Sequence, residues 1–394
     1  MKRLDGHAIL FNNVKDSTYP VVANICSTRD LLASGLGIKK EDFIKKIAHA
    51  IDKPIEPNIV ELDNDYEELE TDLSKLPILV HYKEDGGQYI SSAIIVANDQ
   101  ELGLNSSFHR MMVIGRDRVV ARVLPRHFDE YLKRGNKEFV ICIGNSPQVL
   151  LASAISCELG KSELSIANAL KKTELMRVDG FLAPKAEFIM LAEANGEQHE
   201  EGPFMDLTET FDIVRKQPVI KIKKIYTRKT PLYHALLPGG LEHKILMGLP
   251  REPTIFREVS KVCECKNALI TPGGCSWLHA VVQIKKKHAD DGKKAIEAAF
   301  KGHKSAKHVF VVDDDINPYD WNEIEWAMAT RFQGNKDIIM KKETGSSLDP
   351  SSNLDTRETT KIGFDLTIPW DKNKEDFKKH KIPHEDEIDP KDFV

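Results

Sequence analysis

Hydrophobic and polar positions change their spacing along the chain, and three regions differ in the elements that this spacing predicts. Near the start, Ile44, Ile47 and Ile51 recur at helical spacing with lysines between them, which predicts an amphipathic helix. The middle carries short apolar runs such as EFVICIG and AEFIMLAEA between polar turns, which predicts many short strands in a barrel or a strongly bent sheet. After LLPGG, apolar runs alternate with helical segments, a pattern typical of an α/β domain.

These regions predict a mixed α/β chain of three domains, over residues 1–98, 99–235 and 236–394. In the first, LPILVHY and SSAIIVAN are interpreted as strands, and DNDYEELETDLSKL as a charged, solvated connector. In the second, HRMMVIGRDRVVARVL predicts two strands around a polar turn, and HFDEYLKRG predicts a short helix. In the third, NPYDWNEIEWAMATRF predicts a helix capped by Asp320, and the charged end KNKEDFKKHKIPHEDEIDPKDFV predicts a tail helix or a mobile terminus.

Composition narrows the class of protein. The 394 residues exceed one typical core, which agrees with several domains. Lys and Arg total 56 and Asp and Glu total 61, which gives a net charge of −5, and no basic run with interleaved aromatic residues occurs, so no nucleic-acid partner is expected. The start, MKRLDGHAILFNNV, lacks the apolar core of a signal peptide. Apolar runs also fall well short of the ~20 residues of a membrane span, so we expect a cytoplasmic protein without membrane contact.

The six cysteines are scattered and predict no disulfide framework. Cys263, Cys265 and Cys275 lack the second pair of a zinc site, so a structural role is favoured for them. The acidic run DDD at 313–315 ends an apolar strand, where carboxylates can face a ligand crevice. A solvated loop with capping acids remains the favoured interpretation of that run.

The stretch EEGPFMD, residues 200–206, is a candidate for proton chemistry. Pro203 fixes a backbone angle and Gly202 permits close approach, so this turn can hold Glu201 and Asp206 a few ångströms apart. A nearby Arg would keep one carboxylate ionised while the other donates a proton. Taken alone, a solvated acidic loop is the more common form of such a stretch.

Polar residues in NSSFHR and PRHFDEY form a second candidate. Asn105, Ser107 and Arg110 precede a predicted strand, and His127 follows the next one. An amide oxygen, an imidazole and a carboxylate can bind an ion of the Mn²⁺ type. A turn cap, a helix start and a surface ion pair are the alternatives for these side chains, and a lone His is more often structural.

These stretches occur in a fixed order with three others, YHALLPGGLEHKILMGLPRE, VFVVDDDINPYDWNEIEWAMATRF and KIGFDLT. In this order they resemble the UbiD family of decarboxylases over nearly the whole chain. The resemblance implies reversible decarboxylation of an α,β-unsaturated or aromatic acid with prenylated FMN, which a separate prenyltransferase of the UbiX type supplies. It also implies an N-terminal α/β region, a central split β-barrel of flavin-reductase type, a C-terminal α/β domain, and a homodimer or homohexamer.

The resemblance assigns roles to individual side chains. Arg110, Glu201 and Asp206 fit the family's catalytic residues, with Glu201 paired to Arg110 and Asp206 as the general acid. Asn105, His127 and Glu163 fit its metal ligands, with Glu158 as the competitor of Glu163 and with Mn²⁺ or a similar ion bridging to the flavin phosphate; K⁺ is a further candidate ion. The residues expected to contact the cofactor are Asn105, Ser107, Arg110, Arg126, His127, Ser153, Ala154, Ile155 and Lys361.

Departures from the family pattern bear on the substrate. Met205 stands where the family usually has Gly, which would narrow the pocket beside Asp206, and Arg126 stands where Gln is frequent. The short chain is most similar to the archaeal branch of the family, which implies anhydromevalonate phosphate as substrate and isopentenyl phosphate as product. A 4-hydroxybenzoate-type aromatic acid is the alternative, and a flavin-binding protein without catalysis is a third hypothesis.

Overall fold

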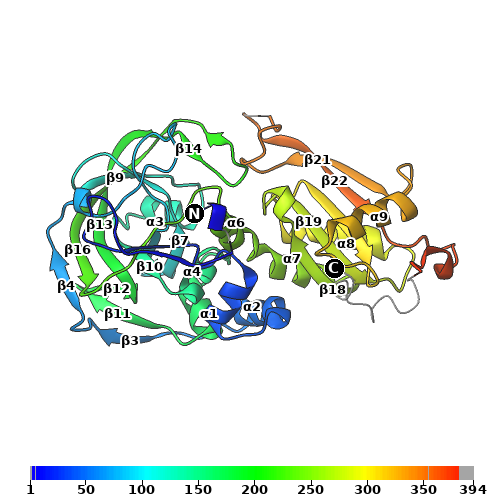
Figure 1. Ribbon diagram of the computed structural model, residues 1–394, viewed down its shortest axis with the longest axis horizontal. Helices are drawn as coiled ribbons and strands as arrows, with labels where there is room; N and C mark the ends of the chain where they lie inside the picture. The colour runs from blue at the N-terminus through cyan, green and yellow to red at the C-terminus, as the bar shows by residue number, and fades with distance from the viewer. Residues whose placement is uncertain (1, 5, 354, 381–394) are drawn as a thin grey trace, which may run out of the picture.

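The computed structural model describes residues 2–4, 6–353 and 355–380. The largest sheet has nine antiparallel strands in the order β5-β8-β9-β16-β13-β10-β6-β7, with β4 beside β16 (Figure 1). Its strands are β4 (Tyr66–Leu69), β5 (Tyr89–Ile90), β6 (Ile94–Asp99), β7 (Gly103–Phe108), β8 (Met111–Val113), β9 (Arg118–Ala121), β10 (Glu138–Asn145), β13 (Ala186–Glu201) and β16 (Arg215–Arg228).

Alternating side chains bury both faces of this sheet. Ile94 and Val96 of β6 join a core formed with the helices of one face, whereas Ile95 and Ala97 join a core on the other face. Because every second residue changes face, a strand covered on both sides is apolar throughout, as the run AIIVA suggests. The helices of this half of the molecule are α1 (Arg29–Leu36), α2 (Phe43–Asp52), α3 (His127–Lys133), α4 (Pro147–Ser153) and α5 (Glu163–Leu170).

Three small sheets complete this half. The first orders its strands β1-β2-β17, the second β12-β11-β3, and β14 pairs with β15 in the third. Their strands are β1 (Ile9–Phe11), β2 (Val21–Ala23), β3 (Asn58–Glu61), β11 (Glu174–Val178), β12 (Phe181–Pro184), β14 (Phe204–Met205), β15 (Phe211–Asp212) and β17 (Tyr233–His234).

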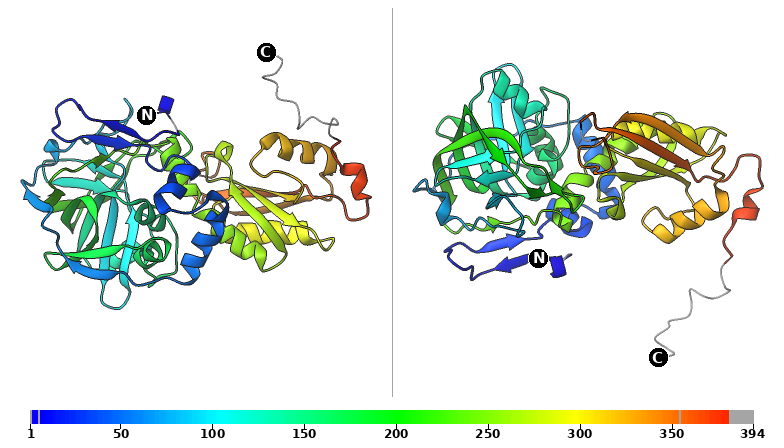
Figure 2. Two further views of the ribbon diagram at one scale, coloured as in Figure 1. Left: turned by 60° about the horizontal axis from the view of Figure 1, so that its bottom comes forward. Right: turned by 90° about the horizontal axis from the view of Figure 1, so that it is seen from above.

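The C-terminal part is built on a five-stranded mixed sheet in the order β18-β19-β20-β22-β21. Alternate residues of β19 face two cores, since Val282 packs with α7 and α8 and Val281 packs on the side of α9. Helices α6 and α7 lie between the two halves, as the views of Figure 2 confirm. Its elements are α6 (Leu241–Gly248), α7 (Arg251–Ser260), β18 (Glu264–Ile270), β19 (His279–Lys285), α8 (Asp291–Gly302), β20 (His308–Asp313), α9 (Trp321–Arg331), β21 (Ile338–Thr344) and β22 (Glu358–Asp365).

The expected mixed α/β class is confirmed. The Asp320 cap is also confirmed, because its side chain accepts a hydrogen bond from the backbone N–H of Asn322. The connector predicted over 63–76 is partly wrong, since β4 within it pairs with β16. The charged tail beyond residue 380 lies outside the described residues.

The strand predicted over 76–82 is wrong. Only Leu79 forms an isolated bridge, with Tyr89. Ile78 is buried in the core of the large sheet, and Pro77 has no N–H for a ladder. This apolar run therefore contributes hydrophobic side chains to the core without joining the sheet.

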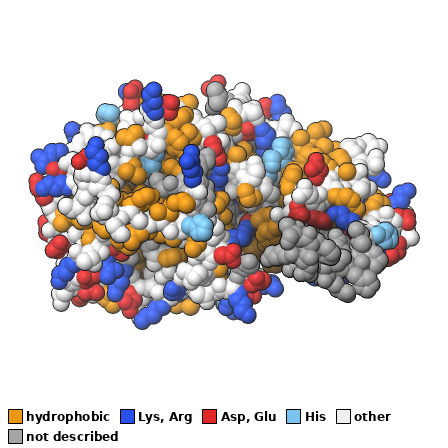
Figure 3. Space-filling model, viewed as in Figure 1, with side chains coloured by type: hydrophobic (Ala, Val, Ile, Leu, Met, Phe, Trp, Pro, Cys, Tyr) orange, Lys and Arg blue, Asp and Glu red, His pale blue; other side chains and the backbone are white. Residues whose placement is uncertain are grey.

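The surface agrees with the composition. Basic and acidic side chains are spread over the face drawn in Figure 3, with hydrophobic side chains among them. In the described part of the chain, no helix has the length and apolar character that crossing a membrane requires.

Candidate active site

A cavity of about 510 Å³ opens where the large sheet meets α6 and α7. Its wall combines residues of β7, the start of α3, the end of α4, the turn after β13 and the first residue of α7. The predicted site residues on this wall are Asn105, Ser107, Arg110, Arg126, His127, Ser153, Ala154, Ile155, Glu163 and Asp206.

The turn at 200–206 is packed rather than solvated, so the loop interpretation is wrong. Strand β13 ends at Glu201, which is completely buried, whereas the preceding Glu200 is exposed. Gly202 has φ +109°, and a Cβ there would lie 3.2 Å from the Ile213 carbonyl oxygen, so glycine is required. Phe204 follows and packs its ring against Tyr89, with 4.5 Å between centroids.

Arg110 forms hydrogen bonds with three carboxylates. Its Nε and Nη2 donate to the two oxygens of Glu201 at 2.9 and 3.0 Å, the two-pronged geometry that suits guanidinium and carboxylate. Its Nη1 donates to Asp206 Oδ2 at 3.2 Å, and Nη2 also donates to Asp212 Oδ2 at 2.8 Å. The Tyr89 hydroxyl donates to Glu201 Oε1 at 3.1 Å. The structure therefore brings together the three predicted catalytic side chains.

Charges within this cluster balance. Burial alone would lower the pKa of Arg110, but the hydrogen bonds and charge of Glu201 and the other carboxylates raise it above its ordinary value. Burial alone would raise the pKa of Asp212, but Arg215 and Arg110 hold it at about 2. Arg122 Nε lies 3.8 Å from Asp212 Oδ2, so three guanidinium groups face three carboxyl groups. Arg110 thus stays charged while it holds Glu201.

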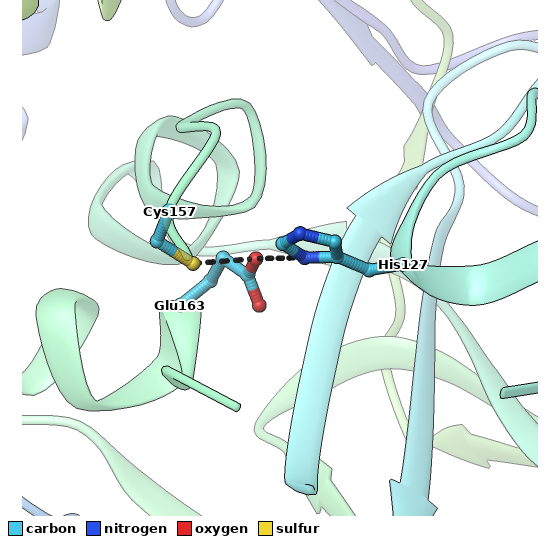
Figure 4. Close-up of side chains that lie close together, drawn as sticks. All are labelled: His127, Cys157 and Glu163. Carbon is cyan, nitrogen blue, oxygen red and sulfur yellow. Dashed lines mark hydrogen bonds and ion pairs between the residues drawn. The ribbon is translucent and has the colours of Figure 1, made fainter. Parts of the chain in front are cut away.

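A second cluster on the cavity wall contains metal-ligand side chains. The Asn105 amide nitrogen donates to both oxygens of Glu163, at 3.2 and 3.1 Å, and the Ser106 backbone N–H donates to Oε2 at 2.9 Å. His127 Nδ1 lies 3.9 Å from Glu163 Oε1. Cys157, which the sequence interpretation missed, points at the same carboxylate (Figure 4). An imidazole, a carboxylate and an amide that can turn its oxygen toward them suit a divalent cation.

Glu163 and Glu158 differ sharply in their surroundings. Burial raises the pKa of Glu163 to about 7 against the opposing hydrogen bonds of Cys157 and Asn105. Glu158 is exposed and pairs with Lys161 at 2.9 Å. Burial and the charge of Arg126 lower the pKa of His127, which favours the neutral imidazole that a metal ion needs.

Basic side chains line the rest of the cavity together with apolar ones such as Leu236, Leu246 and Met247. Arg251 is buried and donates from Nη2 to the Ala154 carbonyl at 2.8 Å, while its Nε has no hydrogen-bond partner among the described residues. Burial and the charge of Arg126 lower the pKa of Arg251 to about 10. His243 accepts a hydrogen bond from the Gly239 N–H at Nδ1, which leaves Nε2 as the protonated nitrogen. Arg251 and His243 carried no role in the sequence interpretation.

Other predicted residues lie away from the cavity. Lys361 on β22 is buried and donates to the Lys304 carbonyl at 2.7 Å, so its contact with a phosphate stays a prediction. Met205 is buried beside Gly239 and does not line the cavity, so the expected narrowing beside Asp206 is not found.

The acidic run at 313–315 makes structural contacts within the C-terminal part. Asp313 is buried, accepts the Ile368 N–H at 2.6 Å and lies 3.3 Å from the buried Arg331, so the favoured interpretation as a solvated loop is wrong for Asp313. The six cysteines are free, and Cys263, Cys265 and Cys275 belong to no metal-ligand cluster among the described residues.

Comparison with known proteins assigns the class. Models of the 3-octaprenyl-4-hydroxybenzoate carboxy-lyase match its N-terminal domain to residues 1–51, its Rift-related domain to 57–241 and its C-terminal domain to 244–366. The chain therefore belongs to the UbiD family of carboxy-lyases.

Two relatives and two solved structures are similar over most of their length. The chain is 44% identical to anhydromevalonate phosphate decarboxylase of Methanocaldococcus jannaschii over 97% of this chain and 94% of that protein. It is 43% identical to the enzyme of the same name from Methanothermobacter thermautotrophicus, over 92% of this chain and 88% of that protein. The UbiD-class enzyme HmfF from Pelotomaculum thermopropionicum, in complex with FMN, superimposes with a TM-score of 0.94 at 35% identity, over 100% and 93% of the two chains. An evolved dimeric form of HmfF in complex with prFMN superimposes with a TM-score of 0.90 at 33% identity, over 100% of this chain and 92% of that chain.

Proposed function

We propose that this protein decarboxylates trans-anhydromevalonate phosphate to isopentenyl phosphate and carbon dioxide with prenylated FMN, as part of an archaeal-type mevalonate route to isoprenoids. The observation that carries the proposal is Arg110, held by buried Glu201 and bonded to Asp206 on the wall of a cavity rich in arginine. The relatives that carry this activity in their name are 44% and 43% identical to the chain over most of its length.

The cavity residues fit a flavin phosphate and a divalent cation. Arg251 offers a buried Nε that has no hydrogen-bond partner in the described part of the chain, and an anion would satisfy it. The end of α4, from Ser153 to Ile155, lines the same wall, and Ser107 and Arg126 face it. Asn105, His127 and Glu163 would hold Mn²⁺ or a similar ion, and K⁺ is a further candidate. When bound, prenylated FMN supplies the electron sink that decarboxylation requires.

Arg110 and Asp206 have different roles: Arg110 orients the substrate, and Asp206 supplies a proton. The substrate carboxylate is an anion, and Arg110 orients it because its guanidinium lies on this wall beside Asp206. Asp206 then donates its proton to the carbon that carried the carboxylate. Glu201 keeps the guanidinium in place throughout because both of its oxygens are engaged.

Positive charge on the wall favours a phosphorylated substrate over an aromatic acid. Arg122, Arg126 and Arg251 line the cavity in addition to Arg110. Arg110 and Arg122 already face carboxylates, so the positive charge available to a phosphate comes from Arg126 and Arg251. A substrate that brings its own phosphate can pair with these two side chains, whereas 4-hydroxybenzoate has no phosphate to offer them.

The domain division, the supply of the cofactor and the oligomeric state are part of the same proposal. We infer a division into residues 1–98, 99–235 and 236–394, with the bent nine-stranded sheet as a split β-barrel of flavin-reductase type. A prenyltransferase of the UbiX type supplies the cofactor, and the chain forms a homodimer or homohexamer.

Reconstitution tests the proposal. Protein coexpressed with a UbiX-type prenyltransferase is incubated with anhydromevalonate phosphate, and carbon dioxide and isopentenyl phosphate are measured. We expect turnover from this protein and none from protein prepared without the prenyltransferase. Equal turnover by both preparations refutes the proposed requirement for prenylated FMN. A prenylated-FMN-loaded protein without turnover refutes the proposed substrate.

A further inference from the structure

Cys157 lies within the candidate metal cluster, although the Asn, His and Glu set does not include it. Its Sγ lies 3.0 Å from Glu163 Oε1 and 3.1 Å from the Lys161 carbonyl oxygen. One donor atom each from His127, Cys157 and Glu163 lie within 4.8 Å of one another. Figure 4 shows the thiol and the imidazole pointing at the carboxylate from opposite sides.

The loop between α4 and α5 directs this thiol inward. Ser156 and Glu158 on either side of Cys157 are exposed, whereas Cys157 itself is half-buried and free of any disulfide. Glu163 stands in the first turn of α5 and His127 at the start of α3, so three separate segments converge on one point. A thiol needed only to fill space would not have to face two metal-ligand side chains.

We propose that Cys157 is a fourth protein ligand of the divalent cation, as a thiolate beside Asn105, His127 and Glu163; this rests on the proposed metal site but not on the substrate. Bonds of about 2.3 Å to sulfur and 2.0–2.2 Å to nitrogen and oxygen place neighbouring ligands roughly 3.5 Å apart. Glu163 Oε1 lies 3.0 Å from Cys157 Sγ and 3.9 Å from His127 Nδ1, and the Asn105 amide must turn so that its oxygen rather than its nitrogen faces the ion. The cation replaces the thiol proton, which passes to solvent, and no electron is transferred.

A sulfur ligand changes which ion the site prefers. Amide oxygen, imidazole and carboxylate accept Mn²⁺ or Mg²⁺, but a thiolate favours softer ions such as Co²⁺, Fe²⁺ and Zn²⁺. The competing role for Cys157 is that of a hydrogen-bond donor that only positions Glu163. The two roles differ in one respect that can be measured, which is whether sulfur bonds to the ion.

Co²⁺ titration of the FMN-saturated protein distinguishes these roles. A thiolate bound to Co²⁺ gives a charge-transfer band in the near ultraviolet of the difference spectrum. We expect this band in wild type and in the Cys263→Ser control, and its loss in Cys157→Ser, with Co²⁺ affinity relative to Mg²⁺ reduced by about tenfold or more. Co²⁺ binding without the band, or a band that persists in Cys157→Ser, overturns the Cys157 ligand but leaves the metal site intact. No saturable Co²⁺ binding overturns both.

Thiol labelling supplies a second test if Cys157→Ser does not fold. Wild-type protein with FMN is treated with iodoacetamide with and without Co²⁺, and the modification of each cysteine is followed by mass spectrometry. We expect Co²⁺ to slow labelling of Cys157 by tenfold or more while Cys263 is unaffected. Equal labelling rates of Cys157 with and without the ion overturn the proposal.

Discussion

Replacing Glu201 by glutamine tests whether its carboxylate holds Arg110. Both oxygens accept hydrogen bonds from Arg110, at 2.9 and 3.0 Å, and Tyr89 donates a further bond at 3.1 Å. Either orientation of the new amide places an N–H₂ group against a guanidinium N–H, because both carboxylate oxygens face Arg110. Removing one partner of a buried ion pair costs about 3–5 kcal/mol. Since Asp206 and Asp212 still face Arg110, we expect the lower end, about 3 kcal/mol.

This loss is large against a total stability of roughly 5–15 kcal/mol, and it displaces the group that orients the substrate. We expect the first unfolding transition in urea to move to lower concentration, and turnover to fall by about 10², since each 1.36 kcal/mol is a factor of ten in rate. The matched control is Glu200→Gln on the adjacent, exposed glutamate, which should change stability by less than about 0.5 kcal/mol. If Glu201→Gln unfolds and turns over like Glu200→Gln, the role of the buried pair is wrong.

Three further predictions concern neighbouring groups. Asp206→Asn should bind flavin like wild type but lower kcat by ~10²–10⁴; unchanged kcat would remove Asp206 as the acid. The pKa of Asp212 falls from 3.8 unfolded to about 2 folded, so its contribution to stability is present above about pH 4 and is lost as pH falls through 2. Wild type should therefore lose roughly 2 kcal/mol more than Asp212→Asn between pH 5 and 2 in urea titrations, and parallel curves would contradict this. Glu163→Gln should weaken Mn²⁺ and flavin retention by about 10–100-fold in equilibrium dialysis, whereas Glu158→Gln should not; equal losses would reject Glu163.

The sequence predicted the three candidate catalytic residues, but it did not predict the residues that form hydrogen bonds with them. Arg110, Glu201 and Asp206 stand in quoted motifs, and the structure joins them with hydrogen bonds. Asp212 lies across the β14–β15 hairpin from the same turn, and the alternation PFMDLTETFD could have indicated it. Tyr89 reaches Glu201 from 112 residues away, which no local pattern encodes.

Competing physical requirements explain the other misses. The apolar run at 76–82 has strand composition, but its side chains are needed in the core and its backbone makes only one bridge. The acidic run at 313–315 favours a solvated loop, but the fold buries Asp313 against Arg331. Cys157 has no partner cysteine at metal-binding spacing, because its neighbours in the cluster come from α3 and α5. Tertiary contacts decide these positions, and single-sequence patterns do not contain them.

The most direct test of the account compares kcat/KM for anhydromevalonate phosphate, for the same acid without its phosphate, and for 4-hydroxybenzoate, with one prenylated-FMN-loaded preparation. Two charge-assisted hydrogen bonds to a phosphate contribute about 3–6 kcal/mol. The account therefore predicts that the phosphorylated acid is preferred by about 10²–10⁴ over the other two. Equal kcat/KM for the acid with and without phosphate, or a preference for 4-hydroxybenzoate, would contradict it.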